Sequence, residues 1–356
     1  MRKVWIILCV LILIVVVVAF LLIQDKSPQN IQSQSYVPEQ PHFGAARVPP
    51  FVADTLEICS FNIQFLGSFK KRDDEALADI LKPYDIVAIQ ELVAPPYDGA
   101  FPDGEPYSGD AEAAEFFDAM QALGFEFLLS EEDTGTGEEN RKNSTATEWF
   151  VTFYNPHAVR PAADLPCGFL AQDRSDHTDF ERVPYAFPFR SVNGTLDFVL
   201  ISVHLQPGDR LVDRQRRQQE LSAISEWIHL NDEIEKDFII LGDMNLYDAE
   251  EVTAVTPDGY LSLNDECRPT NSLAVKDRGN PYDHVMVHTT FTSEVDTAFD
   301  LAVVNLVELM RSHWTASSPY PGEPYDHNLF RQYYSDHFPV VFRLITPTAD
   351  DDGPHL

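Results

Sequence analysis

The chain has 356 residues, and its 57 acidic and 25 basic residues give it a formal net charge of −32. Such a charge repels polyanions at long range, so it argues against tight, sequence-independent binding of nucleic acid. A local basic patch or a bound divalent cation can still reverse the field at one site. Hydrophobic residues make up 44% of the chain, enough for a substantial core.

An apolar run without charged residues occupies residues 4–23. A helix over this run would be about 30 Å long, the thickness of the hydrocarbon core of a bilayer. Arg2 and Lys3 precede the run, which places the N-terminus in the cytoplasm and the rest of the chain on the extracytoplasmic side. We predict that residues 1–23 are an uncleaved, single-pass membrane anchor. The alternative is a cleaved signal peptide, but no small-x-small cleavage site follows the run.

Three further segments follow from composition. Residues 24–54 are rich in Gln, Ser and Pro, which is typical of an extended linker. Residues 55–346 carry regular apolar patterns and are predicted to form one domain, and residues 347–356 form an acidic tail. Outside the apolar run the cysteines match no metal-binding spacing, and one disulfide among them is possible: they are Cys59, Cys167 and Cys267.

Apolar periodicity predicts a mixture of strands and helices along the domain. Strands are expected at residues 56–61, 85–89, 148–154, 183–191, 196–204, 238–241, 282–288, 298–304 and 339–344. Helices are expected at residues 73–81, 111–123 and 210–230. Asn193-Gly194 between two strand patterns is a strong hairpin signal. Residues 97–110 are expected to be a loop, whose interleaved acids suit either solvent or a structural Ca²⁺.

Three short strings place polar side chains beside predicted strands. Gln90-Glu91 and the string at residues 242–245 follow apolar runs, and the string at residues 335–339 precedes one. Side chains at strand ends are held rigidly and can converge on one pocket. Carboxylate and amide oxygens are hard ligands that suit Mg²⁺ or Mn²⁺, while imidazoles transfer protons or contact phosphate. Together these groups indicate hydrolysis of a phosphodiester.

Ten polar residues stand out in chain order. They are Asn62, Glu91, Glu148, Arg182, His204, Asp243, Asn245, Asp283, Asp336 and His337. They lie within short sequence motifs at residues 61–67, 89–91, 147–150, 180–184, 202–205, 241–245, 282–285 and 335–339. This series resembles the endonuclease/exonuclease/phosphatase superfamily, most closely its deoxyribonuclease I branch, over roughly residues 55–345. The resemblance implies an α+β fold: a four-layer α/β sandwich with two central mixed β-sheets packed face to face and helices outside.

The resemblance also implies the metal and phosphate ligands. Glu91 would bind the catalytic Mg²⁺ or Mn²⁺, assisted by Asn62 and Asp336. Asn245 would hold the scissile phosphate, and Arg182 would touch a phosphate of the substrate.

The remaining residues would act on protons. Asp243 would orient or deprotonate the attacking water. His337 would contact the phosphate with its other ring nitrogen bonded to Asp283. His204 would pair with Glu148, and this pair is what points to the deoxyribonuclease I branch. Residues 246–256 contain no cysteine, so the disulfide that this family forms after its Gly-Asp-x-Asn motif is absent.

The leading hypothesis is a membrane-anchored, exported, metal-dependent endonuclease that cuts double-stranded DNA with little sequence specificity. A second hypothesis keeps the chemistry but changes the substrate to a phospholipid or another small phosphoester. A third is a catalytically inactive binding module, against which the complete set of candidate residues argues. The histidines His284, His288, His313 and His327 are expected to play no direct part.

Overall fold

The computed structural model describes residues 54–346, except residue 70, residue 195 and the segments 136–140, 142–145, 173–176, 273–278 and 314–325. All described residues belong to the compact unit that spans residues 48–356. The predicted anchor, the acidic tail and all but the last residue of the predicted linker lie outside them. Among the helices of the described part, none is both long enough and apolar enough to cross a membrane.

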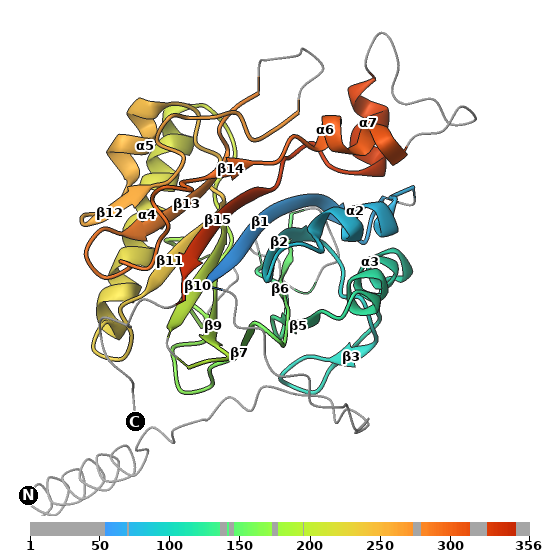
Figure 1. Cartoon of the computed structure of the whole chain (residues 1–356), viewed down its shortest axis with the longest axis horizontal. Coiled ribbons are helices and arrows are strands. Elements are labelled where there is room, and N and C mark those ends of the chain that lie inside the picture. The colour runs from blue at the N-terminus through green and yellow to red at the C-terminus, as the bar shows by residue number, and fades with distance from the viewer. Residues whose placement is uncertain are drawn as a thin grey trace, which may run out of the picture. The chain divides into compact units, whose positions relative to one another are not determined.

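Two mixed β-sheets form the centre of the domain (Figure 1). The first has the strand order β14 (Ala302–Val303), β15 (Val340–Ile345), β1 (Thr55–Leu66), β2 (Ile86–Leu92), β6 (Trp149–Tyr154) and β5 (Glu126–Leu129). The second has the order β12 (Tyr260–Ser262), β13 (Asp283–His288), β11 (Phe238–Asp243), β10 (Asp197–His204), β9 (Tyr185–Ser191) and β7 (Val159–Pro161), and β8 (Gly168–Phe169) also pairs with β9. β1 pairs with β2 and β10 with β11 in parallel, whereas the other pairs are antiparallel.

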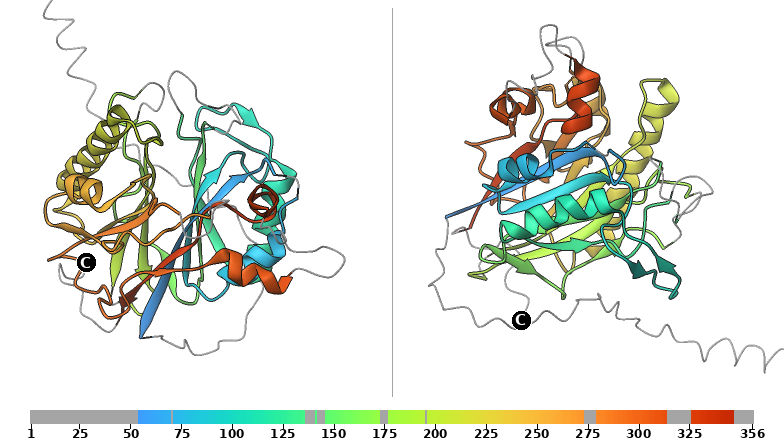
Figure 2. Two further views of the ribbon diagram at one scale, coloured as in Figure 1. Left: turned by 90° about the horizontal axis from the view of Figure 1, so that it is seen from above. Right: turned by 90° about the vertical axis from the view of Figure 1, so that its right-hand side faces the viewer.

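Helices cover the outer faces of both sheets, so the predicted four-layer sandwich is confirmed (Figure 2). The helices are α2 (Asp74–Leu81), α3 (Ala111–Ala122), α4 (Leu211–Asn231), α5 (Ala249–Val255), α6 (Leu306–Leu309) and α7 (His327–Tyr333), with a 3-10 turn η1 (Met310–His313). α2 and α3 lie on the first sheet, while α4 and α5 lie beside the second.

The side chains of β2 point alternately into the two layers of the core. Ile86 and Ala88 pack in the core cluster that also contains the second sheet, whereas Val87 and Ile89 pack in the cluster that contains α2 and α3. Successive side chains of a strand point to opposite faces, so a strand buried on both faces reads as a continuous apolar run.

Most predicted elements are found, with boundaries moved by a few residues. Asp73, expected inside a helix, instead caps α2 by accepting the backbone N–H of Ala76, as short polar side chains do at helix starts. The predicted hairpin is confirmed: β9 and β10 pair antiparallel around Asn193-Gly194, with Gly194 at φ 71°. The strand predicted at residues 298–304 shrinks to Ala302–Val303. Positive φ at Asp300 marks the break.

The structure bears on two points that the sequence left open, the cysteines and the acidic segment. The three cysteines of the domain are free thiols, so no disulfide links them. The acidic segment 97–110 contains a small hairpin, β3 (Gly99–Ala100) and β4 (Pro106–Tyr107). Its carboxylates accept local bonds: Asp98 from the backbone of Gly109, and Asp103 from the backbone of Glu105. These two carboxylates therefore have partners within the segment, and a structural Ca²⁺ there stays a prediction.

Candidate active site

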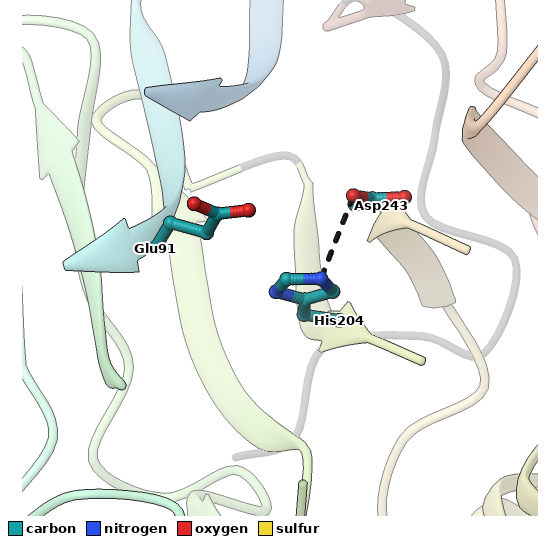
Figure 3. Close-up of side chains that lie close together, drawn as sticks. All are labelled: Glu91, His204 and Asp243. Carbon is teal, nitrogen blue, oxygen red and sulfur yellow. Dashed lines mark ion pairs between the residues drawn. The ribbon is translucent and has the colours of Figure 1, made fainter. Parts of the chain in front are cut away.

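The candidate residues gather where several strands end at one edge of the two sheets. His204 is the last residue of β10 and lies in register with Asp243, the last residue of β11. Asp243 lies in register with Asp283, the first residue of the antiparallel strand β13. From the facing sheet, β2 brings Glu91 (Figure 3). Strand direction and register therefore place residues that are far apart in sequence side by side.

Gly242 is required for this arrangement. It has φ 141°, and a Cβ atom there would lie 2.0 Å from the carbonyl oxygen of Val203 on the neighbouring strand. Only glycine avoids that clash, which allows β11 to carry Asp243 against β10.

Asn62 on β1 bridges carboxylates from the two sheets. Its Nδ2 donates to Glu91 Oε1 at 2.8 Å and to Asp243 Oδ2 at 3.0 Å. Its Oδ1 accepts the backbone N–H of Gln64 at 3.0 Å. Asn62 was predicted to assist Glu91 in binding the metal, and in this structure its amide nitrogen faces the two carboxylates. It holds the carboxylates together, which reduces the repulsion between them.

The first predicted histidine pair is present. His204 Nδ1 lies 3.2 Å from Glu148 Oε1, and its Nε2 lies 3.5 Å from Asp243 Oδ2 (Figure 3 shows the second contact). Glu148 Oε2 also accepts the backbone N–H of Glu91 at 2.5 Å. Burial raises the pKa of Glu148, but His204, Arg182 and the backbone N–H of Glu91 together outweigh burial, and the net shift is downward. Burial lowers the pKa of His204, yet Glu148 and Asp243 leave it raised above 6.5.

The second predicted pair is tighter. His337 Nδ1 lies 2.8 Å from Asp283 Oδ2, and its Nε2 lies 3.6 Å from Asp243 Oδ2. Burial opposes the charged imidazolium, but Asp283 and Asp243 raise the pKa of His337 well above 6.5. The Nδ1 of each imidazole therefore faces its own carboxylate while the Nε2 faces Asp243. This fixes the orientation of both rings.

The other three predicted residues differ in their surroundings. Asn245 donates from its backbone to Asp243 Oδ1 at 3.0 Å and from Nδ2 to the carbonyl of Leu205 at 3.1 Å. Arg182, predicted to touch the substrate, is buried with its Nε 3.7 Å from Glu148 Oε1. Asp336 lies at the rim, 3.6 Å from Nη1 of Arg331 on α7.

Sequence reasoning missed several residues that support the site. The Thr270 hydroxyl donates to Asp283 Oδ2 at 2.7 Å, and that of Ser335 donates to the carbonyl of Asn62 at 2.7 Å. Behind the site, Gln90 Nε2 donates to Ser202 Oγ at 3.2 Å and joins the two sheets. Gln90 and Ser335 stand within strings that the sequence analysis singled out, although these contacts were not expected, whereas Thr270 lies in a segment without periodicity or motif.

The same residues fit a divalent cation. Glu91, His204 and Asp243 offer ligand atoms that all lie within 4.8 Å of one another, as do Asp243, Asp283 and His337. Burial raises the pKa of Glu91, a cost that a bound cation would relieve. Asp336, a predicted ligand, is in neither group. Oxygen-rich sets of this kind suit hard ions such as Mg²⁺ and Mn²⁺.

Comparison with known proteins decides the family. Residues 59–337 match the Endonuclease/Exonuclease/phosphatase family. The chain belongs to this family. Enzymes of the family use divalent metals, in agreement with the acidic and histidine groups described above.

Relatives of this endonuclease/exonuclease/phosphatase protein include a deoxyribonuclease from Thioalkalivibrio sp. (strain K90mix). The two are 26% identical over 326 residues, which covers 85% of this chain and 75% of the relative. Among solved structures, a humanized D. rerio TDP2 with 14 mutations has a TM-score of 0.51 at 17% identity, covering 82% of this chain and 99% of that one. A family member from Bacteroides thetaiotaomicron has a TM-score of 0.51 at 14% identity, covering 82% and 97%. These likenesses support the fold.

Proposed function

We propose that the chain is a Mg²⁺- or Mn²⁺-dependent endonuclease that cuts double-stranded DNA with little sequence specificity. The observation that carries the proposal is the convergence of two histidine–carboxylate pairs on Asp243, beside the bridge from Asn62 to Glu91. The deoxyribonuclease relative supports DNA as the substrate.

Glu91 would hold the metal ion, with Asp243 near enough to share it. When bound, the ion supplies positive charge that stabilises the negative charge of the reacting phosphate. Asp243 would orient or deprotonate the attacking water, and the two imidazole Nε2 atoms that face it fix the position of its carboxylate.

The two imidazoles supply positive charge and donors around Asp243. Asp283 and Asp243 raise the pKa of His337, which favours its charged form, and His337 would donate from Nε2 to a phosphate oxygen and so stabilise the charged transition state. His204, held by Glu148, lies beside the same oxygen of Asp243, Oδ2, that His337 approaches. Asn245 beside Asp243 orients the phosphate.

Weak and nonspecific DNA binding follows from the charges. Contacts to phosphate carry no base information, and a net charge of −32 opposes the approach of DNA. Arg182 is engaged with Glu148 and acts on the substrate through that pair rather than by direct contact.

A panel of substrates tests the proposal. Supercoiled plasmid, RNA, phospholipid vesicles and a small phosphodiester are each incubated with the full-length protein and Mg²⁺ or Mn²⁺. We expect the plasmid to be cut, and raised monovalent salt to inhibit cutting by weakening the phosphate contacts. Intact plasmid together with cleavage of a lipid or small phosphodiester would refute DNA as the substrate and favour a phospholipid or another small phosphoester. Inertness toward all four would favour a binding module.

The proposed location is a membrane, with the catalytic domain on its extracytoplasmic side. This rests on the apolar run at residues 4–23 and on Arg2 and Lys3 before it. A protease added outside intact cells should digest the domain, and cell fractionation should find the full-length protein with the membranes. Protection from the protease, or release of a soluble form shortened at its N-terminus, would contradict the anchor.

A further inference from the structure

The segment after Asn62 on β1 has an unusual backbone. Gln64 and Phe65 have φ values of 58° and 52°, and the register between β1 and β2 shifts between Asn62 and Leu66. Residues other than glycine rarely adopt positive φ, and they keep it only where the surroundings hold them. We call residues 63–67 the β1 bulge. The contacts that hold this backbone conformation therefore also determine where the groups of the bulge lie.

Arg72 holds the β1 bulge from behind. Its Nη1 donates to the carbonyl of Ile63 at 2.6 Å, and its Nη2 donates to the carbonyl of Gln64 at 2.5 Å. Its Nε donates to Glu112 Oε1 on α3 at 2.8 Å, with the arginine side chain fully buried. Glu112 Oε2 accepts the backbone N–H of Gly67 at the far end of the bulge. One Arg–Glu pair therefore fixes both ends of the strained segment.

The same guanidinium reaches a second segment, the turn before His337. Nη1 of Arg72 donates to the carbonyl of Tyr334 at 2.6 Å. The next residue, Ser335, donates from Oγ to the carbonyl of Asn62 and accepts the backbone N–H of His337 at 3.0 Å. The turn and the bulge thus meet at Arg72.

Each segment positions one side of the active site. In the bulge, the backbone N–H of Phe65 donates to Glu91 Oε2 at 3.1 Å, while Asn62 at its start donates to Glu91 Oε1. The turn sets the backbone of His337 through Ser335. Both carboxylate oxygens of Glu91, the residue proposed to bind the metal, are therefore oriented by groups that Arg72 holds in place.

We propose that Arg72 is a positioning residue that keeps Glu91 and the His337 turn in one fixed arrangement for metal binding. Arginine suits this task because its planar fork offers five donors in fixed directions, whereas the ammonium of lysine offers three from a single point. Buried ion pairs often add little net stability, so a role in geometry accounts for this pair better than a role in stability. The inference rests on the proposed metal-dependent function.

The experiment compares Arg72→Lys, Arg72→Met and Glu112→Gln with the wild type, all as full-length protein in detergent. Arg190→Met is the matched control. Arg190 also bonds to carboxylates, Asp197 and Asp164, but Asp197 begins β10, at the opposite end of that strand from His204. Mn²⁺ binding is measured by calorimetry without DNA, and kcat, KM and Tm are measured separately.

We expect Arg72→Lys and Arg72→Met to bind Mn²⁺ at least about 10-fold more weakly and to lose at least about 10-fold in kcat, as is typical when a residue that orients a metal ligand is removed. KM for DNA should stay within about threefold, because Arg72 does not reach the substrate. Glu112→Gln should show a smaller loss of Mn²⁺ affinity, and Arg190→Met should bind Mn²⁺ like the wild type.

Wild-type Mn²⁺ affinity and kcat in the Arg72 variants, even with a lowered Tm, would overturn the proposal and leave Arg72 a stabilising residue. If Arg72→Met does not fold, Arg72→Lys and Glu112→Gln decide, and wild-type Mn²⁺ affinity in both would count against it. A wild-type protein that binds Mn²⁺ but cuts no DNA would instead defeat the proposed substrate, and the comparison of Mn²⁺ affinities would still stand.

Discussion

Replacing Glu91 by Gln, or Asp243 by Asn, should lower kcat by at least about 100-fold while leaving the fold intact. Each substitution removes a negative charge from the group proposed to hold the metal or accept the proton of water, with little change in size. Burial raises the pKa of Glu91, so its ionised form is costly in the folded protein. Glu91→Gln should therefore leave Tm unchanged or raise it. The measurements are plasmid-cleavage rates, with circular dichroism and Tm to verify folding.

Glu57→Gln is the control for that pair. Glu57 lies near the start of β1, beside Arg343 on β15 and remote in register from Asn62, so its charge serves no part of the site. The cleavage rate of Glu57→Gln should stay within about twofold of the wild-type rate. Rates near wild type in both Glu91→Gln and Asp243→Asn would refute the proposed roles.

His204→Ala and His337→Ala should each abolish most of the turnover, whereas Glu148→Gln and Asp283→Asn should cost less and change the pH profile. The pKa of His337 lies well above 6.5 because Asp283 and Asp243 favour its charged form. If the protonated ring is the active one, activity is present below that pKa and is lost as the pH rises through it. Asp283→Asn removes a negative charge beside His337 and so lowers the pKa of His337. The alkaline limb of the kcat profile should therefore move to lower pH by about one unit or more.

His229→Ala is the matched histidine control. His229 lies on the exposed face of α4, with 83% of its side chain accessible, and its partner is Asp232. It should cleave plasmid at the wild-type rate. Equal and small effects of all four substitutions in the two pairs would mean that the pairs are structural.

The sheets could be predicted because a strand that is buried on both faces consists almost entirely of apolar residues. β2 and β11 lie between two layers and read as apolar runs, and the β9–β10 hairpin carries Asn193-Gly194. The strands of two or three residues could not be predicted, because a period of two cannot be recognised over so short a length. α5 was missed for a similar reason: it has only seven residues, too few for a clear helical pattern.

The candidate site could be predicted as a set of residue types in family order, and the two histidine pairs were expected through that resemblance. The contacts that support these residues could not be predicted. The bond from Thr270 to Asp283 depends on a loop whose path is set by tertiary contacts. The positive φ of Gln64 opposes local preference and is held by Arg72. The orientation of Asn62 depends on Glu91 and Asp243 together, and residue type alone does not indicate it.

The central claim is metal-dependent cleavage of DNA at the site formed by Glu91, Asp243 and His337. The most direct measurement follows supercoiled plasmid with the full-length protein and Mg²⁺, then with EDTA, and then with excess Mg²⁺ restored. A parallel preparation of Glu91→Gln excludes a contaminating nuclease. We predict that open-circular DNA forms before linear DNA, that EDTA stops the reaction and that restored Mg²⁺ restarts it. Cleavage that continues in EDTA, or that the Glu91→Gln preparation matches, would contradict the account.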